Sequence, residues 1–272
     1  MSQRFDTISF LSDYGRRDEF VGVVHSVVRS IAPAVAVLDI THDIAPYDVR
    51  AGGLALARSA QYLVPGVVLA VVDPGVGTGR RAVAVEVGDG QSYLVGPDNG
   101  LLAPAVAMVG GATAAITLDN PEYHLASPGP TFDGRDVFGP AAAVLAAEQA
   151  AITDLGPPLP NDSLTPLLLP LVEPEGAGIR GEVWWLDQFG NCQTNVSAED
   201  LTALGASPGG EVTLQVGGTE YELPWVAAYG EVEPGQPLLH LDSYGLIAIA
   251  VREGSAAERL NLSEGHQVVL QA

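Results

Sequence analysis

Apolar residues in the first half of the chain alternate between strand-like runs and helix-like spacing. Short apolar runs predict buried strands at 8–11, 35–40, 67–72, 82–87, 93–95 and 114–118. Apolar residues that recur every three or four positions predict helices at 20–31, 49–63, 100–109 and 139–150. Because strands and helices alternate, we expect residues 1–155 to form an α/β domain with a mainly parallel sheet covered on both faces.

The second half changes character at a proline-rich segment, residues 156–178. Its six prolines exclude a long helix or a central strand, so this segment is predicted to be a linker. Strand-like runs without convincing helices then follow at 181–186, 211–216, 220–223, 237–241, 246–251 and 267–270. Short strands at this spacing predict a small antiparallel barrel or sandwich over residues 179–272.

Composition and charge narrow the classes of protein that fit. The longest apolar run is too short to cross a bilayer and the start lacks a signal peptide, so we expect a cytoplasmic protein. The single cysteine, Cys192, excludes an internal disulfide and a cysteine-based zinc site. Acidic residues outnumber basic ones by 33 to 12, and the net charge is −21. Such a surface repels nucleic acid and anionic membranes, so neither is expected as a partner.

The segment VVDPGVGTGRR, residues 71–81, holds the most suggestive chemistry. A strand runs into Asp73, then through a turn with three glycines, and ends at Arg80 and Arg81. Glycines bring backbone close to a ligand, and an acid beside an arginine gives a charge pair that can do chemistry. The spacing also describes the first motif of many methyltransferases, but that motif follows the first strand of its fold and here it follows the third.

Six short segments, in order, resemble one family. They are FLSDYG (10–15), THDIAPYDV (41–49), VDPGVGTGRR (72–81), GPDNGLL (96–102), TFDGRDVFGPAAA (131–143) and DQFGNCQTN (187–195). Together they resemble the S-adenosyl-L-methionine (SAM) hydroxide adenosyltransferases, the adenosine-forming SAM hydrolases, which are relatives of the SAM-dependent fluorinase and chlorinase. The likeness covers nearly the whole chain.

This resemblance implies a Rossmann-like N-terminal domain, a C-terminal β-barrel and a homotrimer with active sites between subunits. It also implies attack of water or hydroxide on the ribose 5′ carbon of SAM, which yields adenosine and L-methionine. No metal or organic cofactor is expected. The five histidines show no ligand spacing along the sequence, in agreement with that expectation: His25, His42, His124, His240 and His266.

Three residues carry the expected reaction. Asp73 and Arg80 match two members of the family's aspartate–arginine–histidine trio, with Arg81 as the competitor for the arginine's role. Many relatives have histidine in the third position, between phenylalanine and glycine, where this chain has Asp133. Asp133 could act as a general base, order water through Arg80, or only shape the pocket.

The remaining assignments concern substrate binding. Asp13 ends the first strand, where parallel sheets bind ligands, and the matching family aspartate holds the ribose hydroxyls. The resemblance adds Tyr47, Thr131, Phe132, Gly134, Asp187, Phe189, Asn191, Tyr229, Ser243 and the backbone near Val251. A SAM-dependent halogenase is the alternative reaction, although carboxylates at 73 and 133 disfavour a halide. A non-catalytic sensor of adenosine or SAM is the alternative of another class.

Overall fold

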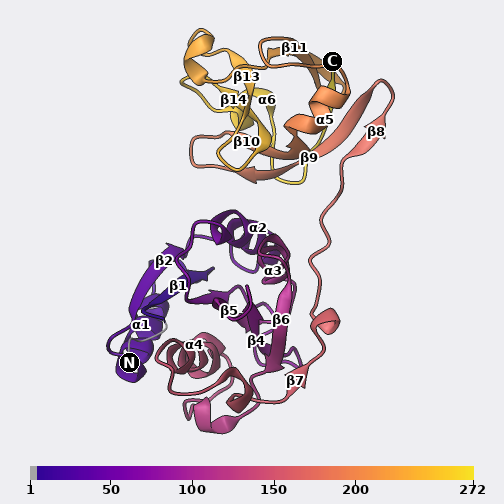
Figure 1. Ribbon diagram of the computed structural model, residues 1–272. Coiled ribbons are helices and arrows are strands. Elements are labelled where there is room, and N and C mark those ends of the chain that lie inside the picture. The colour runs from indigo at the N-terminus through magenta and orange to yellow at the C-terminus, as the bar shows by residue number, and fades with distance from the viewer. Residues whose placement is uncertain (1–4) are drawn as a thin grey trace. The chain divides into compact units, whose positions relative to one another are not determined.

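The computed structural model describes residues 5–272, and these divide into two compact units with the boundary between residues 167 and 168. A seven-stranded sheet forms the first unit, in the order β2-β1-β3-β5-β4-β6-β7 (Figure 1). Its strands are β1 (Thr7–Ser12), β2 (Ala36–Thr41), β3 (Val67–Val71), β4 (Ala82–Val87), β5 (Ser92–Pro97), β6 (Ala112–Thr117) and β7 (Pro158–Leu159). The strands β2, β1, β3 and β5 run parallel, whereas β4, β6 and β7 pair antiparallel.

The antiparallel part begins at a hairpin. A turn at Gly88–Gln91 joins β4 to β5, and three successive residues in it, Gly88, Asp89 and Gly90, have positive φ. Asp-Gly turns of this kind match the twist of paired strands and make them antiparallel neighbours. The expected α/β domain is therefore confirmed, with a sheet that is parallel over its first four strands and antiparallel beyond them.

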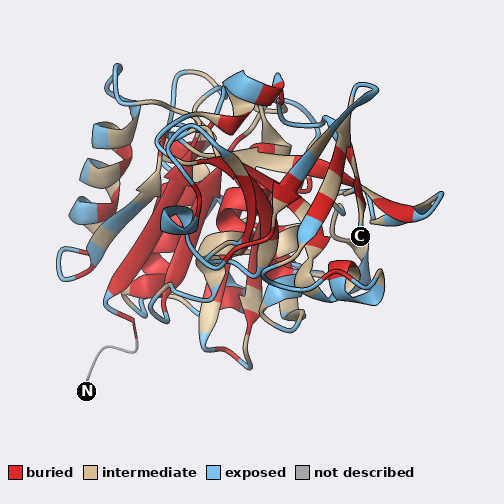
Figure 2. Ribbon diagram, turned by 90° about the horizontal axis from the view of Figure 1, so that it is seen from above, coloured by how far each residue is buried: buried red, intermediate tan, exposed pale blue. Residues whose placement is uncertain are grey.

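Helices cover both faces of this sheet, α1 and α4 on one side and α2 and α3 on the other (Figure 1). Their bounds are α1 (Phe20–Ile31), α2 (Val49–Ala60), α3 (Ala103–Met108) and α4 (Gly139–Ala146). A π-helical turn at Gly134–Phe138 leads into α4, and 3-10 turns lie at Pro121–Tyr123, Ile152–Asp154 and Asn161–Ser163. The central strands are buried along their length, as their red colour in Figure 2 shows. Their Val, Ile and Leu side chains remove apolar surface from water at about 25 cal/mol per Å².

The second unit is an antiparallel sheet that nearly closes on itself. Its main path is β12-β11-β15-β9-β10-β14-β13, with β8 paired to β9. The bounds are β8 (Glu173–Glu175), β9 (Gly178–Leu186), β10 (Cys192–Ser197), β11 (Glu211–Val216), β12 (Thr219–Pro224), β13 (Pro237–Leu241), β14 (Leu246–Val251) and β15 (Gln267–Gln271). Trp225, just after β12, bridges to Leu239 of β13 and so brings the two ends of the path together. The expected barrel-like domain is thus confirmed.

Short helices complete the second unit: α5 (Ala198–Ala203), α6 (Ala256–Leu260) and a 3-10 turn at Tyr229–Glu231. Ser197 caps α5 by accepting a hydrogen bond from the backbone N–H of Asp200. Cys192 is buried in this core, and burial raises the pKa of its thiol to about 12, so it is a packing residue. Across residues 5–272, no helix has the length and apolar character needed to cross a bilayer.

Candidate active site

Two aspartates meet at the carboxyl edge of the parallel strands. Asp13 follows β1 and Asp73 follows β3, and these strands are direct neighbours. The backbone N–H of Asp13 donates to the carbonyl of Val71 at 3.3 Å, which holds the two strand ends together. Ligands of parallel sheets bind at this edge, so the fold places both carboxylates where a small molecule would lie.

Asp13 is positioned by the loop after β2. Its Oδ2 accepts a hydrogen bond of 2.9 Å from the backbone N–H of Tyr47, a residue with positive φ. Burial raises the pKa of Asp13, and the Tyr47 hydrogen bond offsets part of that rise. The Tyr47 side chain is 73% exposed, so its ring is free to stack on a ligand.

Arg80 joins Asp73 and Asp133 into one cluster. Its Nε donates to both carboxylate oxygens of Asp73, at 2.9 and 3.0 Å, and its terminal nitrogen also contacts Asp73. The same terminal nitrogen lies 2.5 Å from Oδ2 of Asp133. Burial alone would lower the pKa of Arg80, but the two carboxylates outweigh it and raise the pKa. The guanidinium therefore stays charged and ties together residues 60 positions apart in the sequence.

The glycine turn is what lets Arg80 fold back. A Cβ at Gly75 would lie 3.1 Å from the Arg80 side chain, and Gly77 has positive φ with its Cβ position 3.0 Å from the carbonyl of Pro130. Arg81 points elsewhere: its Nε donates to Asp98 at 2.8 Å, and its terminal nitrogen reaches the carbonyl of Ser163. Arg80, and not Arg81, is thus the arginine of the cluster.

Tyr14 is a site residue that sequence reasoning missed. Burial raises the pKa of its phenol, and the charges of Asp13, Asp73 and Asp133 raise it further, so the phenol stays protonated in a ring of three carboxylates. A Cβ at Gly134 would overlap the Tyr14 hydroxyl and lie 3.0 Å from its Cζ. The available signal was its place next to Asp13 inside the segment FLSDYG.

The segment before Gly134 supplies an aromatic wall. The ring of Phe132 packs edge-on against Tyr14 at 5.6 Å and against Phe20 at 5.1 Å. Thr131, the residue before it, is exposed. The structure therefore brings Phe132 and Gly134 next to the Tyr14 ring, and a lining role for these residues and for Thr131 stays a prediction.

A second cluster of predicted residues lies in the second unit. Asp187 accepts hydrogen bonds of 2.9 Å from the backbone N–H groups of Phe189 and Asn191, and one of 2.8 Å from the Asn191 side chain. The Asn191 amide also lies 3.4 Å from the Tyr229 hydroxyl. The turn holds the Phe189 ring 68% exposed, so it is available for stacking rather than packed in the core.

Ser243 and Val251 do not join this cluster through their side chains. Ser243 lies in the exposed turn between β13 and β14. The Val251 side chain is buried in the core of the second unit, so only its backbone could contact a ligand.

The net charge of the cluster in the first unit determines which ligands it can bind. Asp13, Asp73 and Asp133 carry three negative charges against the single positive charge of Arg80. A cationic group is attracted to such a site and an anion is repelled. The carboxylates at a strand edge, beside the aromatic rings of Tyr14 and Phe132, define an α/β protein with an acidic small-molecule site suited to a cation.

Comparison with known proteins identifies the class. Residues 8–156 match the SAM hydroxide adenosyltransferase N-terminal domain and residues 181–269 match the C-terminal domain, so the chain belongs to this family and the predicted resemblance is confirmed. An (R)-S-adenosyl-L-methionine hydrolase of Salinispora tropica is 44% identical, with 97% of each chain covered. The enzyme of the same name from Thermus thermophilus is also 44% identical, over 97% of this chain and 98% of its own.

More distant relatives include a fluorinase from an Actinoplanes species, 26% identical over 97% of this chain and 96% of its own. Among solved structures, an uncharacterized conserved protein from Thermotoga maritima superposes with a TM-score of 0.91 at 33% identity, over 97% of this chain and all of that one. The similarity to hydrolases is thus higher than the similarity to this halogenating relative.

Proposed function

We propose that this protein hydrolyses SAM to adenosine and L-methionine, by attack of water at the ribose 5′ carbon. The Asp73–Arg80–Asp133 cluster beside Asp13 is the observation that carries the proposal, in a chain 44% identical to named SAM hydrolases. The water oxygen forms a bond to C5′ while the C5′–sulfur bond breaks. The sulfur keeps the bonding electron pair and leaves as the neutral thioether of methionine, and one water proton passes to a carboxylate and then to solvent.

Asp133 is the better candidate for the proton acceptor. Arg80 occupies both oxygens of Asp73 but reaches only Oδ2 of Asp133, and among the described residues no hydrogen bond reaches Oδ1 of Asp133. The Asp133 side chain is also more exposed, at 18% against 6% for Asp73. Positioning of water by such groups contributes about 7–11 kcal/mol, and a general base about 10²–10⁴-fold in rate. Asp133 would thus replace the histidine of many relatives.

Asp73 has a different role in this proposal. Its charge stabilises the positive sulfonium of the bound substrate, and Arg80 fixes its orientation through two hydrogen bonds. Asp13 binds the ribose hydroxyls, since its carboxylate is anchored by the Tyr47 backbone at the strand edge. The exposed rings of Tyr47, Phe189 and Tyr229 stack on adenine, while Asp187 and Asn191 bind polar edges of the substrate.

The assembly and the cofactor requirement are also part of the proposal. The proposal keeps the homotrimer that the family resemblance implies, with sites that combine the first unit of one subunit with the second unit of another. The reaction needs no metal or organic cofactor, because sulfonium is already a good leaving group. A cytoplasmic location stays a prediction.

Product analysis tests this proposal. We expect chromatography to show adenosine and methionine in equal amounts from SAM, without a methyl acceptor and with no change on addition of chloride or fluoride. Halogenated adenosine as the main product would identify a halogenase. S-Adenosylhomocysteine formed only with an acceptor would identify a methyltransferase. Tight adenosine binding without turnover would identify a sensor.

A further inference from the structure

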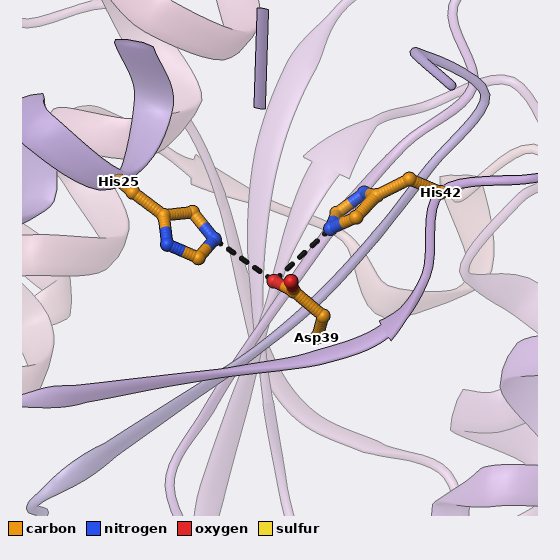
Figure 3. A group of neighbouring side chains, drawn as sticks. All are labelled: His25, Asp39 and His42. Atoms are coloured by element: carbon orange, nitrogen blue, oxygen red, sulfur yellow. Dashed lines mark hydrogen bonds and ion pairs between the residues drawn. The ribbon is translucent and has the colours of Figure 1, made fainter. Parts of the chain in front are cut away.

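Two histidines that lie 17 positions apart converge on one carboxylate in the first unit (Figure 3). His25 comes from α1, Asp39 from β2, and His42 lies just past the end of β2. The Nε2 atoms of His25 and His42 lie 2.8 and 3.0 Å from the same oxygen, Oδ1 of Asp39. One ligand atom from each residue falls within 4.8 Å of the other two.

The His42 ring is fixed by burial and by a hydrogen bond to its second nitrogen, as is usual for histidines that bind metals. Its side chain is fully buried, and its Nδ1 lies 2.7 Å from the Ser12 hydroxyl oxygen. That oxygen is also 3.3 Å from the backbone N–H of Tyr14, which donates to it. An outer partner of this kind fixes the ring orientation of a histidine ligand. Because the Ser12 hydroxyl can donate or accept, it also suits the tautomer with the proton on Nδ1, in which the lone pair of Nε2 faces Asp39.

The contact between His42 and Asp39 is one in which a metal ion could take the place of a proton. Nε2 of His42 is buried and lies 3.0 Å from Oδ1 of Asp39, so without an ion a ring proton must lie between the two atoms. A divalent cation can replace that proton, because the ring nitrogen and the carboxylate oxygen then both turn lone pairs toward the ion. Zn²⁺ binds imidazole nitrogen at about 2.0–2.1 Å and carboxylate oxygen at about 2.0–2.2 Å, so small side-chain shifts would admit the ion between these atoms.

The site is also open to a cation from solvent. The side chains of His25 and Asp39 are 34% and 24% exposed, whereas the His42 side chain is fully buried. The Phe10 ring packs against both imidazoles, at 4.6 Å from His42 and 6.1 Å from His25, and limits their motion. Arg16 competes weakly, because it lies 3.6 Å from the other Asp39 oxygen and is itself largely exposed. The net charge of −21 raises the local concentration of cations.

From these observations we propose that His25, Asp39 and His42 bind a divalent transition-metal cation such as Zn²⁺, with water in the remaining position. Two imidazoles and a carboxylate are ligands that suit Zn²⁺ and related ions rather than Mg²⁺ or Ca²⁺. The ion ties α1 to the segment after β2, the segment that also supplies the Tyr47 contact to Asp13. Its role is structural and does not depend on the proposed reaction.

The test is metal binding by tag-free, chelator-treated protein. Calorimetric titration with ZnCl₂ should show one equivalent bound, and Co²⁺ should give the visible absorption of a low-symmetry nitrogen–oxygen site. His25→Ala, at a partly exposed helix position, should weaken binding by at least about tenfold. His266→Ala, which removes an exposed histidine elsewhere, should bind as the wild type does.

Thermal unfolding gives a second measurement. Zn²⁺ should raise the melting temperature of the wild type and of His266→Ala by several degrees and leave His25→Ala unchanged, because a ligand that binds only the folded state stabilises it. Absence of any one-equivalent binding would overturn the proposal, as would equal affinity in His25→Ala. Either result would identify the three residues as a hydrogen-bonded set only, and adenosine formation would still be measurable.

Discussion

Gly134 offers a sharp test of the site geometry, because its missing side chain is where the Tyr14 hydroxyl lies. A Cβ built at Gly134 overlaps that oxygen and lies 3.0 and 3.2 Å from two ring carbons of Tyr14. The ring cannot move away easily, because Phe10, Phe20 and Phe132 pack around it at 5.6–6.4 Å. Gly134→Ala must therefore displace a ring in a packed site.

The expected magnitude follows from overpacking. Extra methyl groups in a filled site cost about 1–3 kcal/mol, so Gly134→Ala should lower the melting temperature by several degrees. Adenosine release should fall by about 10²-fold, because a shift of about 1 Å in a positioning group has that effect. In a Tyr14→Phe background the overlapped oxygen is gone, so the stability cost of Gly134→Ala should be smaller.

Gly22→Ala is the matched control, since a Cβ at Gly22 in α1 meets nothing within 4 Å. There the substitution should stabilise the protein by about 0.5–1 kcal/mol through helix propensity. Thermal unfolding and steady-state adenosine release measure both effects. Wild-type stability and turnover in Gly134→Ala would refute the placement of Tyr14 against Gly134.

Three further predictions concern the acidic cluster. Arg80→Lys should lower kcat about 10²-fold, because the lysine ammonium lacks the planar fork that binds two carboxylates. Arg81→Lys is the control and should change mainly the melting temperature. Steady-state kinetics and thermal unfolding of both variants measure these effects. Asp133→Asn should lower kcat by about 10²–10⁴-fold, because it removes the proton acceptor. Asp133→His should keep activity, and the acid limb of its pH–rate profile should lie at higher pH, because imidazole is protonated at higher pH than a carboxylate. Asp13→Asn should weaken substrate binding yet stabilise the protein at pH 7, because burial raises the pKa of Asp13 above 3.8 and so makes its charge unfavourable in the folded state. The stabilisation by Asp13→Asn should grow as the pH rises from the pKa of Asp13 in the unfolded state through its pKa in the folded state, and it should vanish below about pH 4. Unfolding experiments at several pH values would test this.

The alternation of strand and helix patterns predicted most of the first unit, because the spacing of apolar residues along an element shows which of its faces is buried. The same pattern could not give strand direction. The Asp89-Gly90 turn between 82–87 and 92–97 is a signal for antiparallel pairing that sequence reasoning did not use, and turn chemistry outweighs the α/β tendency locally. The strand pattern predicted the second unit only as barrel or sandwich, and the choice of barrel came from the family resemblance, since closure depends on the Trp225–Leu239 bridge, a long-range contact without a sequence signal.

The site residues also fall into two groups: those that the sequence predicts and those that only the fold brings together. Strand-end aspartates at 13 and 73 follow from the rule for parallel sheets, and Arg80 follows from its place after the glycine turn. The choice between Arg80 and Arg81 depended on side-chain direction, which neighbouring residues in a sequence cannot show. The pairing of His25 with His42 was hidden for a related reason, because a helix and a strand edge bring them together only in the fold.

The charge balance of the cluster distinguishes hydrolysis from halogenation by magnitude. A halide about 4 Å from a carboxylate is repelled by about 4 kcal/mol at an effective dielectric constant of 20. Three carboxylates against one guanidinium and the sulfonium of the bound substrate leave one such repulsion uncompensated, or about 4 kcal/mol, which is on the order of 10³-fold in occupancy. Neutral water bears no such cost, and it gains hydrogen-bond acceptors from the same groups. The carboxylates that would keep a halide out are therefore the groups that would orient water toward a sulfonium-activated carbon.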